Sequence, residues 1–328
     1  MKPGSALALA LAGVGVWSTL IEPQLFTVRR HTLATLPPGA APLRVLHLSD
    51  LHLAPWQHRK IAWVRSLAEL RPDLIVLTGD LMGHRAARGP LVHALRPLSE
   101  SGAAAVFVHG SNDYYGPIAK NPLKYLLEPS RAHSRPQDID NAALTRSLRD
   151  DLGFTDLNNG AAALELRSNA LELFGLGDPH IRYHDIPAMR EAIREVRGSA
   201  PTRPETGTGP SLSAGPDAVT RLGVVHAPYQ EALGALLDAG ADVMFAGHTH
   251  GGQVRVPGVG ALTANCDLPT AQARGLSVWY DAHRAAFLNV SAGLGASIYS
   301  PVRFACRPEV SLLTLEAARE VRGDEPSA

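Results

Sequence analysis

Short apolar runs that alternate with longer amphipathic stretches constrain the fold of this chain more than any other feature. Short apolar runs bounded by glycine or polar residues are typical of buried strands, and the stretches between them have the spacing of helices. Strand, helix and strand joined by short connections predict a parallel or mixed sheet with helices on its faces. The predicted strands are 43–48, 74–77 and 104–108, and the predicted helices are 58–70 and about 86–101.

The second half of the chain also contains short apolar runs and amphipathic stretches, which predict further strands and helices. Alternation over 163–180 predicts a hairpin that leads into a second sheet. Prolines and charges in 116–150 predict a surface excursion with a helix near 141–150, and Pro, Gly, Ser and Thr in 199–216 predict a mobile loop. The other predicted elements are strands at 222–225, 243–246, 287–297 and 310–317 and a helix at 229–239.

The predicted strands end in side chains that can bind a metal, at the sheet edge where ligands sit in such folds. Taken singly, Asp50 and Asp80 are explained equally well as helix caps, and His226 as a core histidine. Seven oxygen and nitrogen donors exceed the four that one zinc ion takes, and they suit two ions that share a carboxylate. The predicted ligands are Asp50, His52, Asp80, Asn112, His226, His248 and His250.

The N-terminal segment 1–30 contains the uncharged, mostly apolar stretch 5–21. Its length lies at the lower limit for a helix that crosses a bilayer. A membrane anchor or membrane-lying helix is preferred over a signal peptide or a helix packed on the domain. Arg29 and Arg30 after the segment favour a cytoplasmic location for the rest of the chain. Prolines in 31–42 predict a linker, which leaves 43–317 as the domain and 318–328 as a charged tail.

The charge composition argues against one class of partner, the nucleic-acid polymers. The chain has 31 basic and 31 acidic residues, so no overall field favours a nucleic-acid polymer, and none is expected as a partner. Cys266 and Cys306 form no C-x-x-C pair, which argues against a zinc ribbon and leaves a disulfide or two free thiols open.

Taken together, these motifs resemble the calcineurin-like metallophosphoesterase superfamily. The resemblance covers residues 43–253 and is carried by Asp50-Leu51-His52, Gly79-Asp80, the Gly110–Asp113 loop, His226 and Gly247-His248-Thr249-His250. Within the superfamily, the chain is most similar to a membrane-associated bacterial branch with an N-terminal hydrophobic segment and the sequence GHTHGGQ. The resemblance and the strand pattern predict an α/β fold, a four-layer α/β/β/α sandwich of two mixed sheets.

The resemblance also implies roles for single residues. Asp50, His52 and His250 would bind a first divalent ion, Asp80 would bridge to a second, and the second ion would be held by Asn112, His226 and His248. A hydroxide that bridges the ions would attack phosphorus. The mixed oxygen and nitrogen donors fit manganese, iron or zinc.

One loop departs from the family pattern, which reads Gly-Asn-His followed by an acid. Here the loop is Gly110-Ser111-Asn112-Asp113. Aligning the glycines would make Ser111 the ligand, whereas aligning the asparagines makes Asn112 the ligand and puts Asp113 at the histidine. We prefer the second alignment, because an amide oxygen binds a divalent ion better than a serine hydroxyl. The usual proton donor to the leaving group is then missing, and Asp113, His84 and His109 are candidates to replace it.

These observations predict a dinuclear-metal phosphoester hydrolase that acts on a diester or pyrophosphate in a lipid-linked or nucleotide-type substrate. One alternative is a weakly catalytic or non-catalytic metal-binding module at the membrane, because the usual histidine is absent. Another is a soluble nucleotide phosphodiesterase released by signal cleavage. Asp178 and His180 are interpreted as a turn, and Tyr114 and Tyr115 as packing residues.

Overall fold

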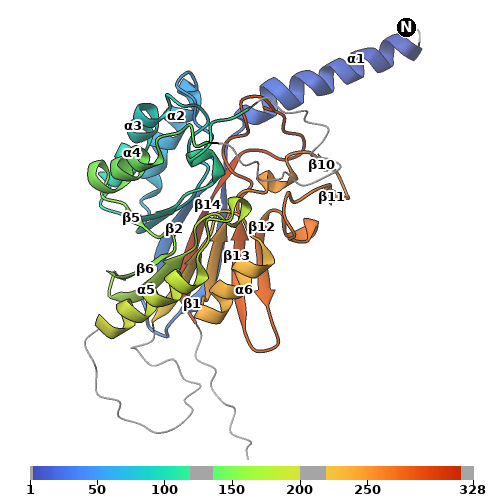
Figure 1. Cartoon of the computed structure of the whole chain (residues 1–328). Coiled ribbons are helices and arrows are strands. Elements are labelled where there is room, and N and C mark those ends of the chain that lie inside the picture. The colour runs from blue at the N-terminus through green and yellow to red at the C-terminus, as the bar shows by residue number, and fades with distance from the viewer. Residues whose placement is uncertain (1–2, 119–135, 200–218, 319–328) are drawn as a thin grey trace, which may run out of the picture.

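Two six-stranded sheets lie face to face at the centre of the computed structural model, which describes residues 3–118, 136–199 and 219–318 (Figure 1). The first sheet has the order β1-β14-β2-β3-β4-β5. β2 to β5 are parallel, while β14 is antiparallel to β2 and parallel to β1. The strands are β1 (Thr27–Leu36), β2 (Leu43–Leu48), β3 (Leu74–Thr78), β4 (Ala104–Val108), β5 (Thr155–Asp156) and β14 (Glu309–Ala317).

The second sheet has the order β12-β13-β9-β8-β7-β6. Its central strands β13, β9, β8 and β7 are parallel, and the two edge strands are antiparallel to their neighbours. The strands are β6 (Gly160–Leu166), β7 (Asn169–Gly175), β8 (Thr220–Val224), β9 (Val243–Ala246), β12 (Gly275–Tyr280) and β13 (Ala285–Val290). A small separate hairpin pairs β10 (Arg255–Val256) with β11 (Gly260–Ala261).

Helices cover the outer face of each sheet (Figure 1). Side chains alternate along each buried strand. In β3, Val76 packs against the second sheet, whereas Ile75 and Leu77 pack against the helices that cover the first sheet. This arrangement confirms the predicted four-layer sandwich of two mixed sheets. The helices are α2 (His58–Ser66), α3 (Arg88–Ser99) and α4 (Asn141–Arg146) on the first sheet, and α5 (Ile186–Ser199) and α6 (Gln230–Ala239) on the second.

The linker prediction for 31–42 is wrong for its first half, because residues 31–36 belong to β1. Leu33 and Leu36 are buried between the sheets, and Arg29 at the start of the strand pairs with Glu309 of β14 at 3.0 Å. β1 completes the sheet only by pairing with a strand near the other end of the chain. A local reading of prolines and glycines cannot detect such a partner.

Three further predicted segments lie wholly or partly outside the described residues. Almost all of the loop predicted at 199–216, half of the excursion at 116–150 and the tail from 319 lie outside them. Of the alternatives left open for the cysteines, the structure has both thiols free, with Cys306 buried and Cys266 half-buried.

Helix α1 (Pro3–Val16) projects away from the sandwich at the end where α2 and the β10–β11 hairpin lie (Figure 1). Its side chains are exposed, for example Leu7 at 63% and Leu11 at 63%, so α1 itself is not packed on the domain. Two short helical turns, 17–21 and 22–24, continue it and bury Ser18 and Glu22. Within the described residues, Leu7–Gln24 is long and apolar enough to cross a membrane.

Candidate metal centre

The carboxyl ends of five strands deliver the predicted ligands to one edge of the two sheets. Loops after β2, β3 and β4 come from the first sheet, and loops after β8 and β9 come from the second. Most of the ligands have left-handed backbones, which non-glycine residues rarely adopt and which cluster at functional sites at a cost of about 1–3 kcal/mol each. The positive φ angles are +48° at Asp50, +38° at His52, +52° at Asp80, +66° at His248 and +49° at His250.

The ligand atoms form two groups that share Asp50. One group contains Asp50, His52 and His250, and the other contains Asp50, Asp80 and His226; the ligand atoms within each group lie within 4.8 Å of one another. His250 Nε2 is 3.7 Å from Asp50 Oδ1. The two oxygens of Asp80 face different histidines, with Oδ2 3.4 Å from His52 Nε2 and Oδ1 3.6 Å from His226 Nε2. These separations are too long for hydrogen bonds.

The imidazoles are oriented with one nitrogen free to bind an ion. His226 Nδ1 is 2.6 Å from the carbonyl oxygen of Thr78, and His250 Nδ1 is 3.1 Å from that of Gly295. A nitrogen that faces a carbonyl carries the proton, so the opposite nitrogen is left as a ligand. His226 Nε2 and both ring nitrogens of His52 are buried without a hydrogen-bond partner. Because such buried groups are normally satisfied, these residues fit a divalent cation.

Burial makes the electrostatics of the centre unfavourable without such a cation. Burial raises the pKa of Asp50 to about 6, and the neighbouring Asp80 carboxylate adds to the shift. Burial lowers the pKa of His52 to about 3. For His226, burial acts to lower the pKa, but the Asp80, Asp178 and Asp50 carboxylates outweigh it and raise the value to about 9. Burial therefore opposes the ionised form of the Asp50 carboxylate, and a divalent cation bound beside it would favour that form.

Asn112 lies at the centre, as the preferred alignment requires. Its backbone N–H donates to Asp80 Oδ1 and its side-chain Nδ2 to Asp80 Oδ2, both at 2.7 Å. The side-chain NH₂ group is therefore committed to Asp80, which leaves the amide oxygen as the donor to an ion. His248 lies beside His226, with ring centroids 5.2 Å apart, and its Nε2 faces the Asn265 carbonyl at 3.2 Å.

Asp113 does not lie in a position that suits proton transfer to a leaving group. It is fully buried, and its carboxylate accepts backbone N–H bonds from Leu81, Met82 and Gly110 at 2.8–3.0 Å. Burial acts to raise its pKa, but these hydrogen bonds and His109 outweigh it, and the pKa is lowered. His109 is equally withdrawn, with Nε2 2.8 Å from Thr145 Oγ1. The structure therefore does not support the predicted proton-donor role of Asp113.

Replacing Asp113 with alanine should destabilise the fold, because three buried N–H groups would lose their acceptor at about 1–3 kcal/mol each. Urea unfolding measures the loss. Asp281→Ala is a matched control, since Asp281 also accepts two backbone N–H bonds but at an exposed turn where water replaces it. Equal losses for both variants would contradict the structural role of Asp113.

Asp178 and His180 are the site residues that sequence reasoning underrated. Asp178 does cap the predicted turn, since its Oδ1 accepts the N–H of His180 at 2.9 Å. Its Oδ2 is nevertheless buried without a partner, and burial raises its pKa to about 7. The His180 ring lies 4.5 Å from that of His248, and its Nδ1 is 3.0 Å from Tyr229 Oη. The sequence contains one sign of a site here. The apolar run before Gly177-Asp178 ends in a glycine followed by a carboxylate, as the predicted strand before Gly79-Asp80 does.

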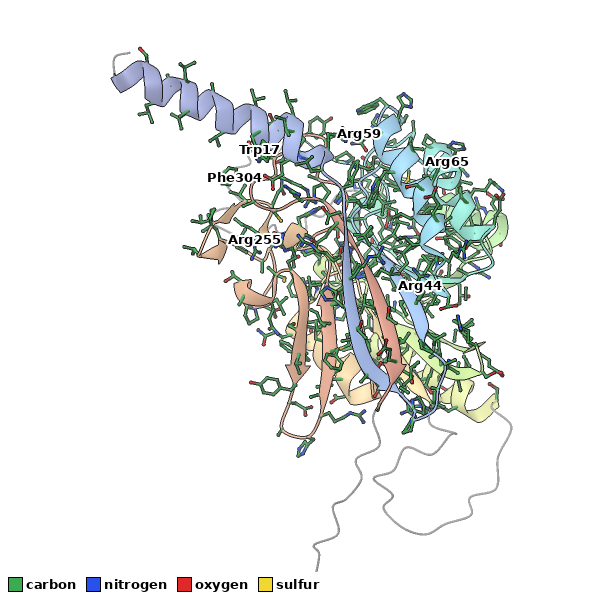
Figure 2. All side chains as sticks on the ribbon, turned by 180° about the vertical axis from the view of Figure 1, so that it is seen from behind. Trp17, Arg44, Arg59, Arg65, Arg255 and Phe304 are labelled. Carbon is green, nitrogen blue, oxygen red and sulfur yellow. The ribbon has the colours of Figure 1, made fainter. Side chains whose placement is uncertain are left out.

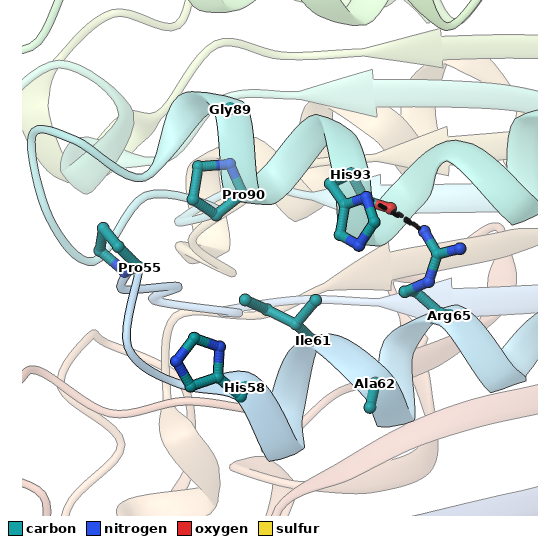
Figure 3. A pocket seen from close by; sticks show the side chains of 8 residues that line it. All are labelled: Pro55, His58, Ile61, Ala62, Arg65, Gly89, Pro90 and His93. Carbon is teal, nitrogen blue, oxygen red and sulfur yellow. Dashed lines mark hydrogen bonds between the residues drawn. The ribbon is translucent and has the colours of Figure 1, made fainter.

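A hollow of about 650 Å³ opens between α2 and α3 (Figure 3). It is lined by His58, Ile61 and Pro90, and Arg65 donates across it to the carbonyl oxygen of His93. It contains none of the predicted ligands and is therefore separate from the strand-end centre.

Known proteins resemble the chain over this same region. The family model of the calcineurin-like phosphoesterases matches residues 43–252. The chain is 28% identical to phosphodiesterase YaeI of Escherichia coli, over 90% of each chain. It is 29% identical to UDP-2,3-diacylglucosamine pyrophosphatase LpxG of Chlamydia trachomatis, over 91% of this chain and 92% of that one. A dimetal phosphatase from Danio rerio aligns with 77% of this chain and 88% of its own at 12% identity, with a TM-score of 0.36.

The match covers the five strand-end loops and the strands β2 to β9, from which those loops follow. Members of this family hydrolyse phosphoesters with divalent metals, which is the chemistry that the buried carboxylates and imidazoles suit. The chain belongs to the calcineurin-like phosphoesterase family, and it is a metal-dependent phosphoester hydrolase.

Proposed function

We propose that this hydrolase cleaves a phosphodiester or pyrophosphate bond with two divalent ions. The observation that carries the proposal is the pair of adjacent ligand groups that share Asp50, one of which also contains Asp80. The oxygens of Asp80 that face His52 and His226 support a bridging role for this carboxylate. Paired ions are suited to a phosphoryl centre because they stabilise both the attacking and the leaving oxygen.

The first ion would be held by Asp50, His52 and His250, and the second by Asn112, His226 and His248, with Asp80 shared. Carboxylates mixed with imidazoles suit manganese, iron or zinc. When bound, the ions polarise phosphoryl oxygens and lower the pKa of water from 15.7 toward about 7. The protein contributes rigid positions for the ligands and a buried floor that excludes bulk water.

Asn112 is expected to be a ligand and Ser111 is not. Asn112→Ala should lower diester hydrolysis by about 10²-fold and weaken one of the two metal sites, whereas Ser111→Ala, the matched control on the same loop, should change both little. Rates are measured against metal concentration, and bound metal is counted by mass spectrometry. A larger effect of Ser111→Ala would favour the other alignment of this loop.

The leaving group is expected to matter more than in a site with an imidazole donor. The Asp113 carboxylate and the His109 Nε2 are occupied by hydrogen bonds within the protein, so we expect neither side chain to supply the general-acid contribution of about 10²–10⁴-fold. A series of aryl diesters of rising leaving-group pKa should show steadily falling rates. A flat series would mean that another residue protonates the leaving oxygen.

The substrate class is proposed from the relatives. YaeI is named a phosphodiesterase and LpxG a pyrophosphatase of a diacylated nucleotide sugar. We propose a lipid-linked or nucleotide-type diester or pyrophosphate for this chain. The apolar helix α1 supports membrane association, and Arg29 and Arg30 after it support a cytoplasmic domain.

The test is hydrolysis of bis(p-nitrophenyl) phosphate by the manganese-loaded chain, beside the p-nitrophenyl monoester. Diester turnover that depends on metal is expected. No diester turnover, with two metals bound per chain, would instead favour the role of a metal-binding module.

A further inference from the structure

The foot of the N-terminal helix is tied to the loop 303–306. The carbonyl oxygen of Ser18 accepts the N–H of Arg303 at 2.8 Å, and the Glu22 carboxylate accepts the N–H of Ala305 at 3.0 Å. Ser18 is 7% exposed and Glu22 2%. The position of the helix foot is therefore determined by the domain.

The same loop pairs with the β10–β11 hairpin. The N–H of Phe304 donates to the carbonyl oxygen of Gln253 at 3.1 Å, and the N–H of Arg255 donates to that of Phe304 at 2.9 Å. Figure 2 shows Trp17, Phe304 and Arg255 on the same side of the molecule below the helix. Helix foot, loop 303–306 and hairpin are thus one connected unit.

The length of the helix determines how deep this unit would lie in a bilayer. Helix α1 alone is about 21 Å long, and with the turn Trp17–Ile21 it reaches about 28 Å. The hydrocarbon core of a bilayer is about 30 Å thick. A helix that spans it must therefore place Leu20 and Ile21, 67% and 42% exposed, inside the membrane. Because Ser18 precedes these two residues, the loop bonded to Ser18 must reach at least into the headgroup region of the bilayer.

The hairpin has the side chains that such a position favours. Val259 at its tip is 75% exposed, and Val256 and Leu262 beside it are 40% and 48% exposed. Gly258 and Gly260 have positive φ angles, which makes the turn tight and the tip narrow. Exposed apolar side chains grouped in this way mark an interaction surface. The guanidinium of Arg255 at the base of the hairpin donates from Nη1 to the carbonyl oxygen of Gly251 at 2.9 Å, and its positive charge at this position favours anionic headgroups.

We propose that the β10–β11 hairpin inserts its apolar tip into the membrane interface as a second contact beside α1. This inference rests on the proposed membrane association. With two contacts the domain can no longer rotate about a single helix, so one face is held toward the bilayer. That face is linked to the metal centre, because Cys306 Sγ donates to the carbonyl oxygen of His250 at 3.3 Å. A substrate that lies in the same membrane would be presented to the centre in one orientation.

The test uses the full chain with an environment-sensitive fluorophore on Val259→Cys in a Cys266→Ser background, in which Cys306 is buried and unreactive. The matched control is Tyr280→Cys in the same background. Tyr280 is 72% exposed, as Val259 is 75% exposed, but it lies beside the β12–β13 turn at the opposite end of the sheet. The vesicles contain phosphatidylethanolamine and phosphatidylglycerol.

In vesicles, the emission at position 259 should shift to the blue and be quenched by nitroxide-labelled lipids, and the emission at 280 should do neither. A chain that floats with the vesicles while position 259 keeps an aqueous spectrum would overturn the second contact alone. A chain that does not float at all would overturn the membrane association as well, and diester hydrolysis in solution would still test the proposed chemistry separately.

Discussion

Replacing His248 with alanine is expected to lower metal-dependent hydrolysis of bis(p-nitrophenyl) phosphate by about 10³-fold or more, since a divalent ion contributes several kcal/mol to such a transition state. The change removes only the imidazole. The backbone N–H of residue 248 would still donate to Asp50 Oδ2, at 3.0 Å in the wild type. Metal analysis should show that one of the two proposed ions is lost or bound more weakly.

Asp80→Asn should have an effect of the same order, because it keeps the shape of the side chain and removes the charge shared by His52 and His226. His283→Ala is the matched control for loss of an imidazole, since His283 lies exposed between β12 and β13. If His248→Ala retained both ions and most of its activity, the assignment of His248 as a ligand would have to be abandoned.

The second large effect is expected from Gly247→Ala, although it adds only a methyl group. The backbone of Gly247 has no positive φ, so alanine is not strained there. Its Cβ would overlap Ser49 Oγ and lie 2.5 Å from Asp50 Oδ2. Asp50 must then move, and both ligand groups lose a shared carboxylate. Activity should fall about as far as in His248→Ala, with a stability loss of about 1–3 kcal/mol from overpacking.

Gly234→Ala provides the control for this substitution. Gly234 lies in α6, where a Cβ would meet nothing within 4 Å. Alanine there should raise stability by about 0.5–1 kcal/mol and leave hydrolysis unchanged. Urea unfolding and diester turnover of the two variants are compared directly. If Gly247→Ala remained active, Ser49 and Asp50 could make room for the added methyl group without moving Asp50 out of its ligand position.

Much of the site is predictable because it depends on which residues follow one another within a short stretch of sequence. A buried strand that ends in a glycine and a carboxylate or imidazole is visible in the residues themselves, as in Gly79-Asp80 and Gly247-His248. The strands β2, β3, β4 and β9 and the helix α6 agree with their predicted bounds within a residue or two. Each has a strong apolar pattern and clear turn residues at its ends.

The predictions that fail depend on partners far away in the chain. Part of β1 reads as a linker because its partner β14 begins 273 residues after Leu36, at Glu309. Asp113 has the residue type and position of an acid, whereas the N–H groups of Leu81 and Met82 that occupy its carboxylate come from the loop after another strand. Asp178 is a different case, because the predicted turn is present and only the burial of its second oxygen without a partner is not visible in the sequence.

The sequence by itself determined the fold class, the order of the strands that carry ligands, and which side chains are chemically able to bind metal. These properties depend on hydrophobic period and residue type, which are local. Only the tertiary structure decided that Asp50 belongs to both groups of candidate ligands, which ring nitrogens of His52 and His226 are buried without a hydrogen-bond partner, and that the helix foot and the β10–β11 hairpin form one unit. Those depend on distances and hydrogen bonds between loops far apart in the chain, and packing of the two sheets is what brings those loops together.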